Sequence, residues 1–286
     1  MKVGTTLPQR RPGGKSASWA DMERLAKRAE EAGADSLWVA DHFFYRDETQ
    51  EIGLHEAFTI LTGVAAVTSR VQVGPLVAAT SFRSAGSLAK IAATLDVVSR
   101  GRLILGLGCG WHEAEYTSFG YPFDHRVGRF EEIVSALRRL LHGERVTVDG
   151  KWMQLDDAVI LPPPEREIPL LIASNGPRML QITARFADAW QAAWFGKPDD
   201  EFREQRASLL EACRAVDRPN GIEIFVGVDA TDEESDSPHL PIDASAIADA
   251  LGEWADEGVD HVQVRVHPGS DANFETALDG IQRFKG

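Results

Sequence analysis

The feature that most constrains the fold is one repeated unit, a short apolar strand followed by an amphipathic helix. The unit returns eight times along 286 residues. The predicted strands are Lys2–Leu7, Ser36–Ala40, Val71–Val77, Arg102–Leu107, Pro169–Ala173, Asp188–Ala192, Glu223–Val228 and His261–Val266. Strands that alternate with helices form a parallel sheet covered on its faces. Eight such units predict an α/β fold, a (β/α)8 TIM barrel, which typically needs about 250 residues. An open doubly wound sheet is the alternative.

Local signals support these units. Ser18, with Asp21 three residues later, resembles a capping box at the start of the first helix. Pro177 occupies a favoured first helical position. Residues 145–159 alternate around Asp149-Gly150, which is a strong short-range hairpin signal. This segment predicts a small β-hairpin insertion before strand 5.

Charge and cysteine content exclude several classes of protein. The formal net charge is −14, which argues against nucleic-acid and anionic-membrane partners. Cys109 and Cys213 lie far apart in a sequence without a CxxC or Cys/His cluster, so a zinc framework is not expected and a reducing compartment is. Neither a signal peptide nor an apolar run of membrane-spanning length is evident. We therefore expect a cytoplasmic protein.

In a TIM barrel, function lies at the carboxyl ends of the strands. The second strand ends at Asp41-His42. A histidine at this place suits acid–base chemistry near neutral pH, with Asp41 orienting the ring or accepting a ligand donor. The alternative is a histidine that only makes structural hydrogen bonds.

Two further strand ends are candidates for ligand contacts. The fourth strand runs into glycines 106, 108 and 110, where missing side chains either admit a flat ligand or a phosphate or permit close strand packing. The fifth strand ends at Ser174-Asn175-Gly176, just before a helix N-terminus, where free N–H groups bind anions and Arg178 adds a charge. The alternative there is an ordinary turn with a solvated arginine.

Two longer segments resemble signatures of the luciferase-like monooxygenase superfamily. They are Glu31–Phe43 (EAGADSLWVADHF) and Ser99–Glu115 (SRGRLILGLGCGWHEAE), and Gly120–Phe123 and Ala187–Trp190 follow in the family's order. The resemblance covers almost the whole chain. It implies a single TIM-barrel domain over residues 1–286, a homodimer, and a flavin or deazaflavin at the barrel mouth. The Asp-His-Phe and Gly-Trp-His-Glu-Ala-Glu variants resemble the branch that uses coenzyme F420.

The resemblance also implies roles for particular residues. The histidine matching His42 lies by the reactive ring and acts on substrate, and Asp41 belongs to the polar contacts of the ring. The segment matching Leu76-Val77 often holds a non-proline cis peptide under the ring. The segments matching Cys109-Gly110 and Ser174–Arg178 line the cofactor tail and phosphate.

The chain departs from the sugar-phosphate dehydrogenases of that branch. Those enzymes carry a glutamate where Trp111 stands, and a tryptophan soon after Asp-His-Phe, where Tyr45-Arg46 follows here. We therefore expect hydride transfer between F420 and a small, more apolar organic substrate, with a possible partner that reduces the cofactor.

Three alternatives stand beside this expectation. The first is an FMN-dependent monooxygenase that uses O2 and reduced flavin from a partner reductase. The second is a barrel that binds the cofactor without catalysis. The third, a metal-dependent hydrolase, lacks a ligand cluster at the predicted strand ends.

Overall fold

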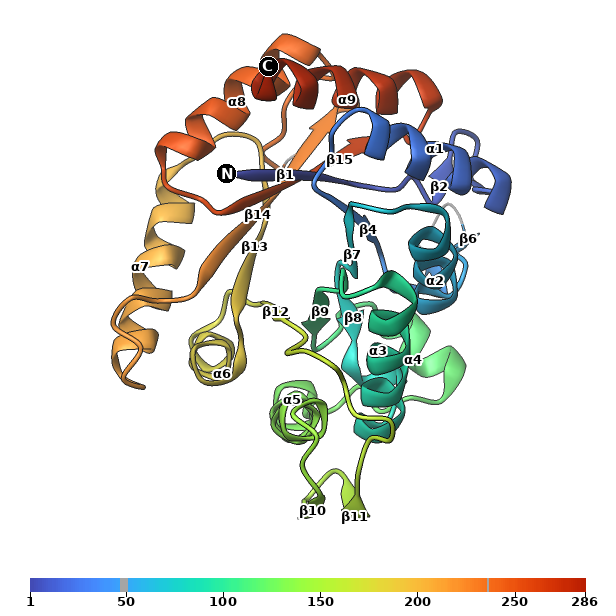
Figure 1. The fold of residues 1–286 in the computed structure, drawn as a ribbon. Coiled ribbons are helices and arrows are strands. Elements are labelled where there is room, and N and C mark those ends of the chain that lie inside the picture. The colour runs from blue at the N-terminus through green and yellow to red at the C-terminus, as the bar shows by residue number, and fades with distance from the viewer. Residues whose placement is uncertain (47–50, 236) are drawn as a thin grey trace.

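The computed structural model describes residues 1–46, 51–235 and 237–286, and it is a parallel barrel surrounded by helices (Figure 1). The strands of the main sheet are β1 (Lys2–Thr6), β4 (Ser36–Val39), β7 (Gln72–Pro75), β8 (Ala78–Ala79), β9 (Leu105–Gly108), β12 (Leu170–Ala173), β13 (Ala189–Phe195), β14 (Glu223–Thr231) and β15 (His261–His267). Their order is β7-β4-β1-β15-β14-β13-β12-β9-β8, and every paired strand in it is parallel.

The barrel is closed because β7 and β8 are two halves of one strand. β7 pairs with β4, and β8 pairs with β9. A parallel bridge between Val73 and Leu103 adds a further contact across the seam. The predicted TIM barrel is confirmed, and the open sheet is wrong.

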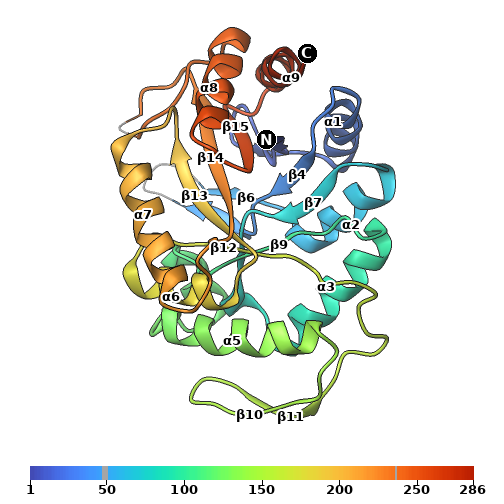
Figure 2. The ribbon, with the colours of Figure 1, turned by 60° about the vertical axis from the view of Figure 1, so that its left-hand side comes forward.

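Helices cover the outside of the barrel (Figure 2). They are α1 (Trp19–Glu31), α2 (Ala57–Val67), α3 (Ala85–Ser99), α4 (Glu113–Phe119), α5 (Arg126–Leu141), α6 (Pro177–Phe186), α7 (Asp200–Arg214), α8 (Ala244–Asp256) and α9 (Asp271–Lys285), with a 3-10 turn η1 (Thr80–Phe82). The capping box at Ser18 and the first-turn position of Pro177 are confirmed. Within the described residues, no helix has both the length and the apolar character to cross a membrane.

Each of the eight predicted strands differs from the observed strand at one or both ends, and the third and fourth differ in ways that bear on the site. The third, predicted as Val71–Val77, is interrupted at the Leu76–Val77 peptide, which is cis, as the family resemblance implies. The fourth, predicted to start at Arg102, starts at Leu105. Arg102 instead turns its guanidinium to the end of α2, where it donates to the carbonyls of Ala65 and Thr68.

The predicted insertion is confirmed as the antiparallel hairpin β10 (Val146–Asp149) and β11 (Gln154–Ala158), which projects beyond α5 in Figure 2. The carboxylate of Glu132 on α5 accepts hydrogen bonds from three backbone amides at the tip of this hairpin, those of Lys151, Trp152 and Met153. The structure adds two hairpins that the sequence did not predict, because strands of two or three residues are too short to show an alternation of apolar and polar residues. They are β2 (Arg10–Arg11) with β3 (Lys15–Ser16), and β5 (Phe44–Arg46) with β6 (Glu51–Gly53).

The amino end of the barrel interior holds an apolar cluster around Trp38 and Phe225, with a small polar group beside it. Trp38 Nε1 donates to Ser36 Oγ at 2.6 Å, and the same oxygen lies 2.7 Å from Nε2 of His261. Burial lowers the pKa of His261 to about 3, so this imidazole is neutral at physiological pH. The chemistry of the barrel is therefore expected at its other end.

Candidate functional site

A cavity of about 660 Å³ opens at the carboxyl ends of the strands. Segments on all sides of the barrel mouth contribute to its lining, which includes Thr6, Gln9, Arg10, Asp41, His42, Tyr45, Leu54, Leu76, Val77, Gly110, Trp111, Ala173, Gln191, Trp194, Arg265 and His267. It therefore unites five of the predicted site residues: Asp41, His42, Leu76, Val77 and Gly110.

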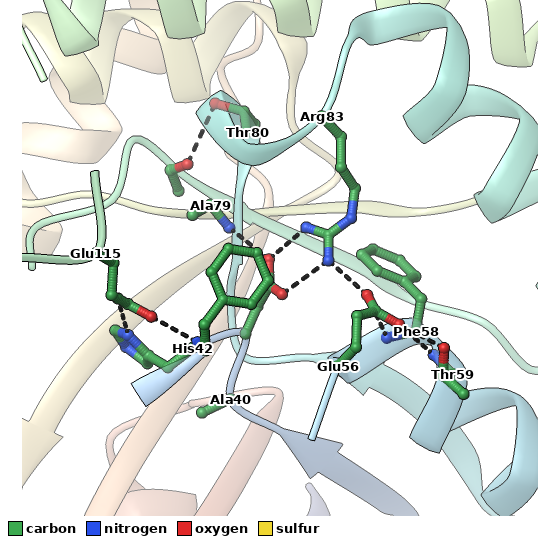
Figure 3. Close-up of polar contacts among 12 residues, drawn as sticks. Ala40, His42, Glu56, Phe58, Thr59, Ala79, Thr80, Arg83 and Glu115 are labelled. Carbon is green, nitrogen blue, oxygen red and sulfur yellow. Dashed lines mark hydrogen bonds and ion pairs between the residues drawn. The ribbon is translucent and has the colours of Figure 1, made fainter. Parts of the chain in front are cut away.

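His42 is held by a buried carboxylate (Figure 3). Its Nδ1 lies 2.6 Å from Oε2 of Glu115, whose side chain is 1% exposed. The other carboxylate oxygen, Oε1, accepts the backbone N–H of Phe43 at 2.5 Å. Glu115 thus fixes both the imidazole and the loop that carries it, and Nε2 is the ring nitrogen left for a ligand in the cavity.

Aromatic side chains flank this imidazole. The ring centroid of Tyr45 is 4.4 Å from that of His42, and the ring centroid of Trp111 is 5.5 Å from it. Trp111 is 63% exposed, an unusual state for such a large apolar group. Burial raises the pKa of Tyr45 to about 12, so its hydroxyl stays protonated. Tyr45 and Trp111 thus give this side of the cavity a mostly aromatic surface beside one oriented base.

Asp41 has a structural task in addition to its place in the lining. Its carboxylate receives two hydrogen bonds from Arg83, at 2.6 and 2.9 Å, and one from the backbone N–H of Ala79 at 3.0 Å (Figure 3). Arg83 also contacts Glu56, the N-cap residue of α2. Asp41 therefore ties the end of β4 to the segment that follows the break between β7 and β8.

The glycine-rich end of β9 serves mainly close packing. A Cβ at Gly106 would overlap the carbonyl oxygen of Pro75, and a Cβ at Gly108 would lie 2.7 Å from the side chain of Val77. Gly110 differs because it lines the cavity, has a φ of +74°, and would overlap Tyr116 if it carried a Cβ. Of the two hypotheses for these glycines, strand packing accounts for the first two.

Cys109 lies outside the cavity lining, next to Gly110. Its carbonyl accepts the Tyr116 hydroxyl at 2.9 Å, and burial raises the pKa of its thiol. The carbonyl of Gly110 accepts a hydrogen bond from Arg126. These contacts fix the backbone at this edge of the mouth.

The predicted anion site lies at the N-terminus of α6. Gly176 is the N-cap residue, and a Cβ built there meets no atom within 4 Å, so the space before the helix is open. The Ser174 hydroxyl is 2.8 Å from the hydroxyl of Thr183, and Asn175 is exposed. The free N–H groups of the first turn form the positive end of the helix dipole.

Arg178 lies in that first turn but is not in the cavity lining. It donates to Glu131 at 2.9 Å, and Arg185 donates to the same carboxylate at 2.5 Å. Two guanidinium groups share one carboxylate, so one positive charge remains near the helix start. The structure thus places Ser174–Arg178 at the same end of the barrel as His42, on the far side of the mouth.

Several residues in or next to the cavity escaped the sequence reasoning. Glu115 is the last residue of the fourth-strand signature, and a carboxylate at that place was the sign in the sequence that it could have a role in the site. Arg265 forms two hydrogen bonds with Asp229, at 3.0 and 2.9 Å, from neighbouring positions on β15 and β14. Gln191 is 2% exposed, and its Oε1 has no hydrogen-bond partner among the described residues. A ligand N–H is the natural partner for that oxygen.

His267 also lines the cavity. Burial and the charge of Arg265 lower the pKa of its imidazole to about 4. His267 is therefore neutral at physiological pH. His42, in contrast, lies beside the buried carboxylate of Glu115. Among the described residues, no group of three or more His, Cys, Asp and Glu side chains is arranged to hold a metal ion.

The chain is similar to several known proteins. The chain is 32% identical over 256 residues to an F420-dependent glucose-6-phosphate dehydrogenase of Kineococcus radiotolerans, covering 79% of this chain and 74% of the relative. It is 30% identical to a phthiodiolone/phenolphthiodiolone dimycocerosates ketoreductase of Mycobacterium bovis, covering 80% and 67%.

Solved structures share the fold. An F420-dependent secondary alcohol dehydrogenase in complex with an F420-acetone adduct matches with a TM-score of 0.82 at 18% identity, covering 99% of this chain and 97% of the other. The F420-dependent tetrahydromethanopterin reductase of Methanopyrus kandleri matches with a TM-score of 0.79 at 19% identity, covering 99% and 100%. The sequence profile described as luciferase-like monooxygenase matches residues 1–269. The chain belongs to the luciferase-like monooxygenase family.

Proposed function

We propose that this protein is an oxidoreductase that transfers a hydride between coenzyme F420 and a small organic substrate with an apolar body. The observation that carries the proposal is His42 at the cavity wall with Nδ1 held by buried Glu115. The names of the relatives support the cofactor. Leu54, Trp111 and Trp194 support the apolar substrate body, because they line the same space.

The residues present fit a deazaflavin cofactor. Leu76 and Val77 offer a surface for a flat ring, and the unpartnered Oε1 of Gln191 offers an acceptor for a ring N–H. The open N-terminus of α6 at Gly176 suits the cofactor phosphate, with Cys109 and Ser174–Arg178 along the tail. When bound, F420 supplies the hydride chemistry, and the protein supplies orientation and electrostatics.

The role of His42 follows from its contacts. Reduction of a carbonyl or imine needs a proton as well as a hydride, and Nε2 is placed to donate that proton into the cavity. In the opposite direction, Nε2 accepts the proton from an alcohol. Glu115 holds the imidazole in one orientation.

The test of this proposal is a titration of the purified protein with F420 and with FMN, followed by anaerobic turnover with reduced F420 and a panel of ketones and enones. We expect F420 binding and oxygen-independent turnover. Turnover that requires O2 and FMNH2 from a separate reductase would establish the monooxygenase alternative. Binding without turnover in either assay would favour a barrel that only carries the cofactor.

The proposal includes a cytoplasmic homodimer supplied with reduced cofactor by a partner enzyme, and it includes neither nucleic-acid nor membrane partners. Light scattering of the purified protein tests the dimer, which we expect at twice the chain mass of 31.3 kDa.

A further inference from the structure

Arg10 is a cation at the cavity wall, and the described part of the chain supplies no acidic partner for it. It lies on β2, is half-buried, and lines the cavity. Its Cζ is 5.2 Å from the centroid of the Tyr45 ring. Among the described residues, no carboxylate lies within ion-pair distance of Arg10, although its neighbour Arg11 pairs with Asp271.

The second guanidinium of the cavity is already neutralised. Arg265 pairs through two hydrogen bonds with Asp229, and its Cζ lies 3.8 Å from the centroid of the Trp194 ring. Among the described residues, Arg10 is thus the guanidinium of the cavity without a carboxylate partner, in a chain whose formal net charge is −14. A half-buried charge beside apolar walls interacts strongly with an opposite charge.

Arg10 lies across the barrel mouth from the anion site of α6. Arg10 follows β1 and Gly176 follows β12. In the sheet order, β15, β14 and β13 separate these strands on one side, and β4, the split strand β7/β8 and β9 separate them on the other. A cofactor whose phosphate binds at α6 therefore leaves the side of Arg10 to the substrate.

Arg10 and His42 also flank the same ring. The His42 centroid lies 4.4 Å from that of Tyr45, over which Arg10 is placed. A substrate group bound to Arg10 and a reacting carbon beside His42 are therefore separated by a short carbon chain.

We propose, on the basis of the function proposed above, that Arg10 is a specificity-determining residue that binds a carboxylate of the substrate. The substrate class is a short organic acid with an apolar body and a reducible carbonyl group or double bond. One guanidinium balances one carboxylate and matches its two oxygens. A phosphate dianion needs a second cation, and Arg265 is committed to Asp229.

The test uses binding of three probes of equal chain length: hexanoate, hexanamide and hexyl phosphate. Fluorescence of Trp111 and Trp194, which line the cavity, reports binding to the whole protein. We expect hexanoate to bind at least about tenfold more tightly than hexanamide. Arg10→Gln should abolish this preference, and Arg10→Lys should retain part of it. The matched control is Lys15→Gln, an equal charge change at an exposed position of the same hairpin, which should leave the preference intact.

Three results would overturn the proposal. They are equal binding of hexanoate and hexanamide (including no binding of either), a preference that survives Arg10→Gln in a variant with unchanged circular dichroism, and tighter binding of hexyl phosphate than of hexanoate. These measurements need no cofactor, so they stand apart from the F420 titration. A hexanoate preference that depends on Arg10, without F420 binding, would refute the proposed function and leave the carboxylate site in place.

Discussion

Glu115 Oε2 and His42 Nδ1 lie 2.6 Å apart although their positions in the chain differ by 73 residues. Since this contact orients the imidazole, we predict that Glu115→Gln lowers turnover by about 10–100-fold while F420 affinity stays within a few-fold.

The matched control for this variant is Glu113→Gln, at an exposed position on the same helix α4. It should leave both turnover and F420 affinity unchanged. Equal losses in the two variants would mean that Glu115 supports only the fold of α4.

Removal of the imidazole itself is the stronger change. His42→Ala should lower turnover by about 10²–10⁴-fold, the usual value of a placed general acid. Cofactor binding should stay within a few-fold, because Nδ1 is directed at Glu115. Full activity of this variant in anaerobic stopped-flow assays would show that His42 is structural.

The anion site at α6 can be tested with two substitutions of Gly176 that have nearly the same shape but differ in charge. Gly176→Asp places a carboxylate where we expect the cofactor phosphate, so F420 should bind at least tenfold more weakly, about 1.4 kcal/mol. Gly176→Asn has nearly the same shape, and both residues are good N-caps. The neutral variant should therefore bind F420 almost normally, and equal affinities in the two would place the phosphate elsewhere.

At Gly110 the expected loss is in stability. A Cβ there meets the Tyr116 hydroxyl, and φ is +74°. Gly110→Ala should lower the free energy of unfolding by about 2–4 kcal/mol in urea titrations. The double variant Gly110→Ala/Tyr116→Phe should recover part of that loss. Without recovery, backbone strain alone would explain the effect.

Buried His261 predicts an acid-sensitive fold. Its folded-state pKa of about 3 lies below the ordinary value of 6.5, so the unfolded chain binds the proton first. Above pH 6.5 the imidazole is neutral in both the folded and the unfolded chain, so it adds no pH dependence there, and stability falls as the pH drops from 6.5 toward 3. The slope is up to about 1.4 kcal/mol per pH unit for this group.

Denaturant titrations between pH 7 and pH 4 measure this effect. His261→Gln, which does not titrate and keeps a polar group beside Ser36, should flatten the dependence. His142→Gln, at an exposed position, should not. An unchanged slope in His261→Gln would assign the acid sensitivity to other groups.

Strands and helices were largely predictable because their signals are local. Periodic apolar residues, the capping box at Ser18 and the turn at Asp149-Gly150 each act within a few neighbouring residues. The interruption at Leu76–Val77 was not readable from the apolar pattern, which continues through it, and only the family resemblance indicated the cis peptide there.

The site was predictable one residue at a time but not as pairs. Asp41 and His42 stand out at a strand end, yet their partners Arg83 and Glu115 come from other units of the barrel. Such pairs form when the closed sheet brings different loops to one rim, and no spacing in a single sequence encodes them. Arg10 was hidden for a similar reason, because its hairpin is too short to show a pattern.

Glu131 and Glu132 are adjacent on α5 and hold different segments. Glu132 accepts three amides from the tip of the β10–β11 hairpin, and Glu131 binds Arg178 in the first turn of α6. Two adjacent residues of α5 therefore connect the hairpin insertion to α6, the helix that begins at the anion site. The hairpin is therefore held in place at its tip, and a change in the length of the tip would also alter the position of α6.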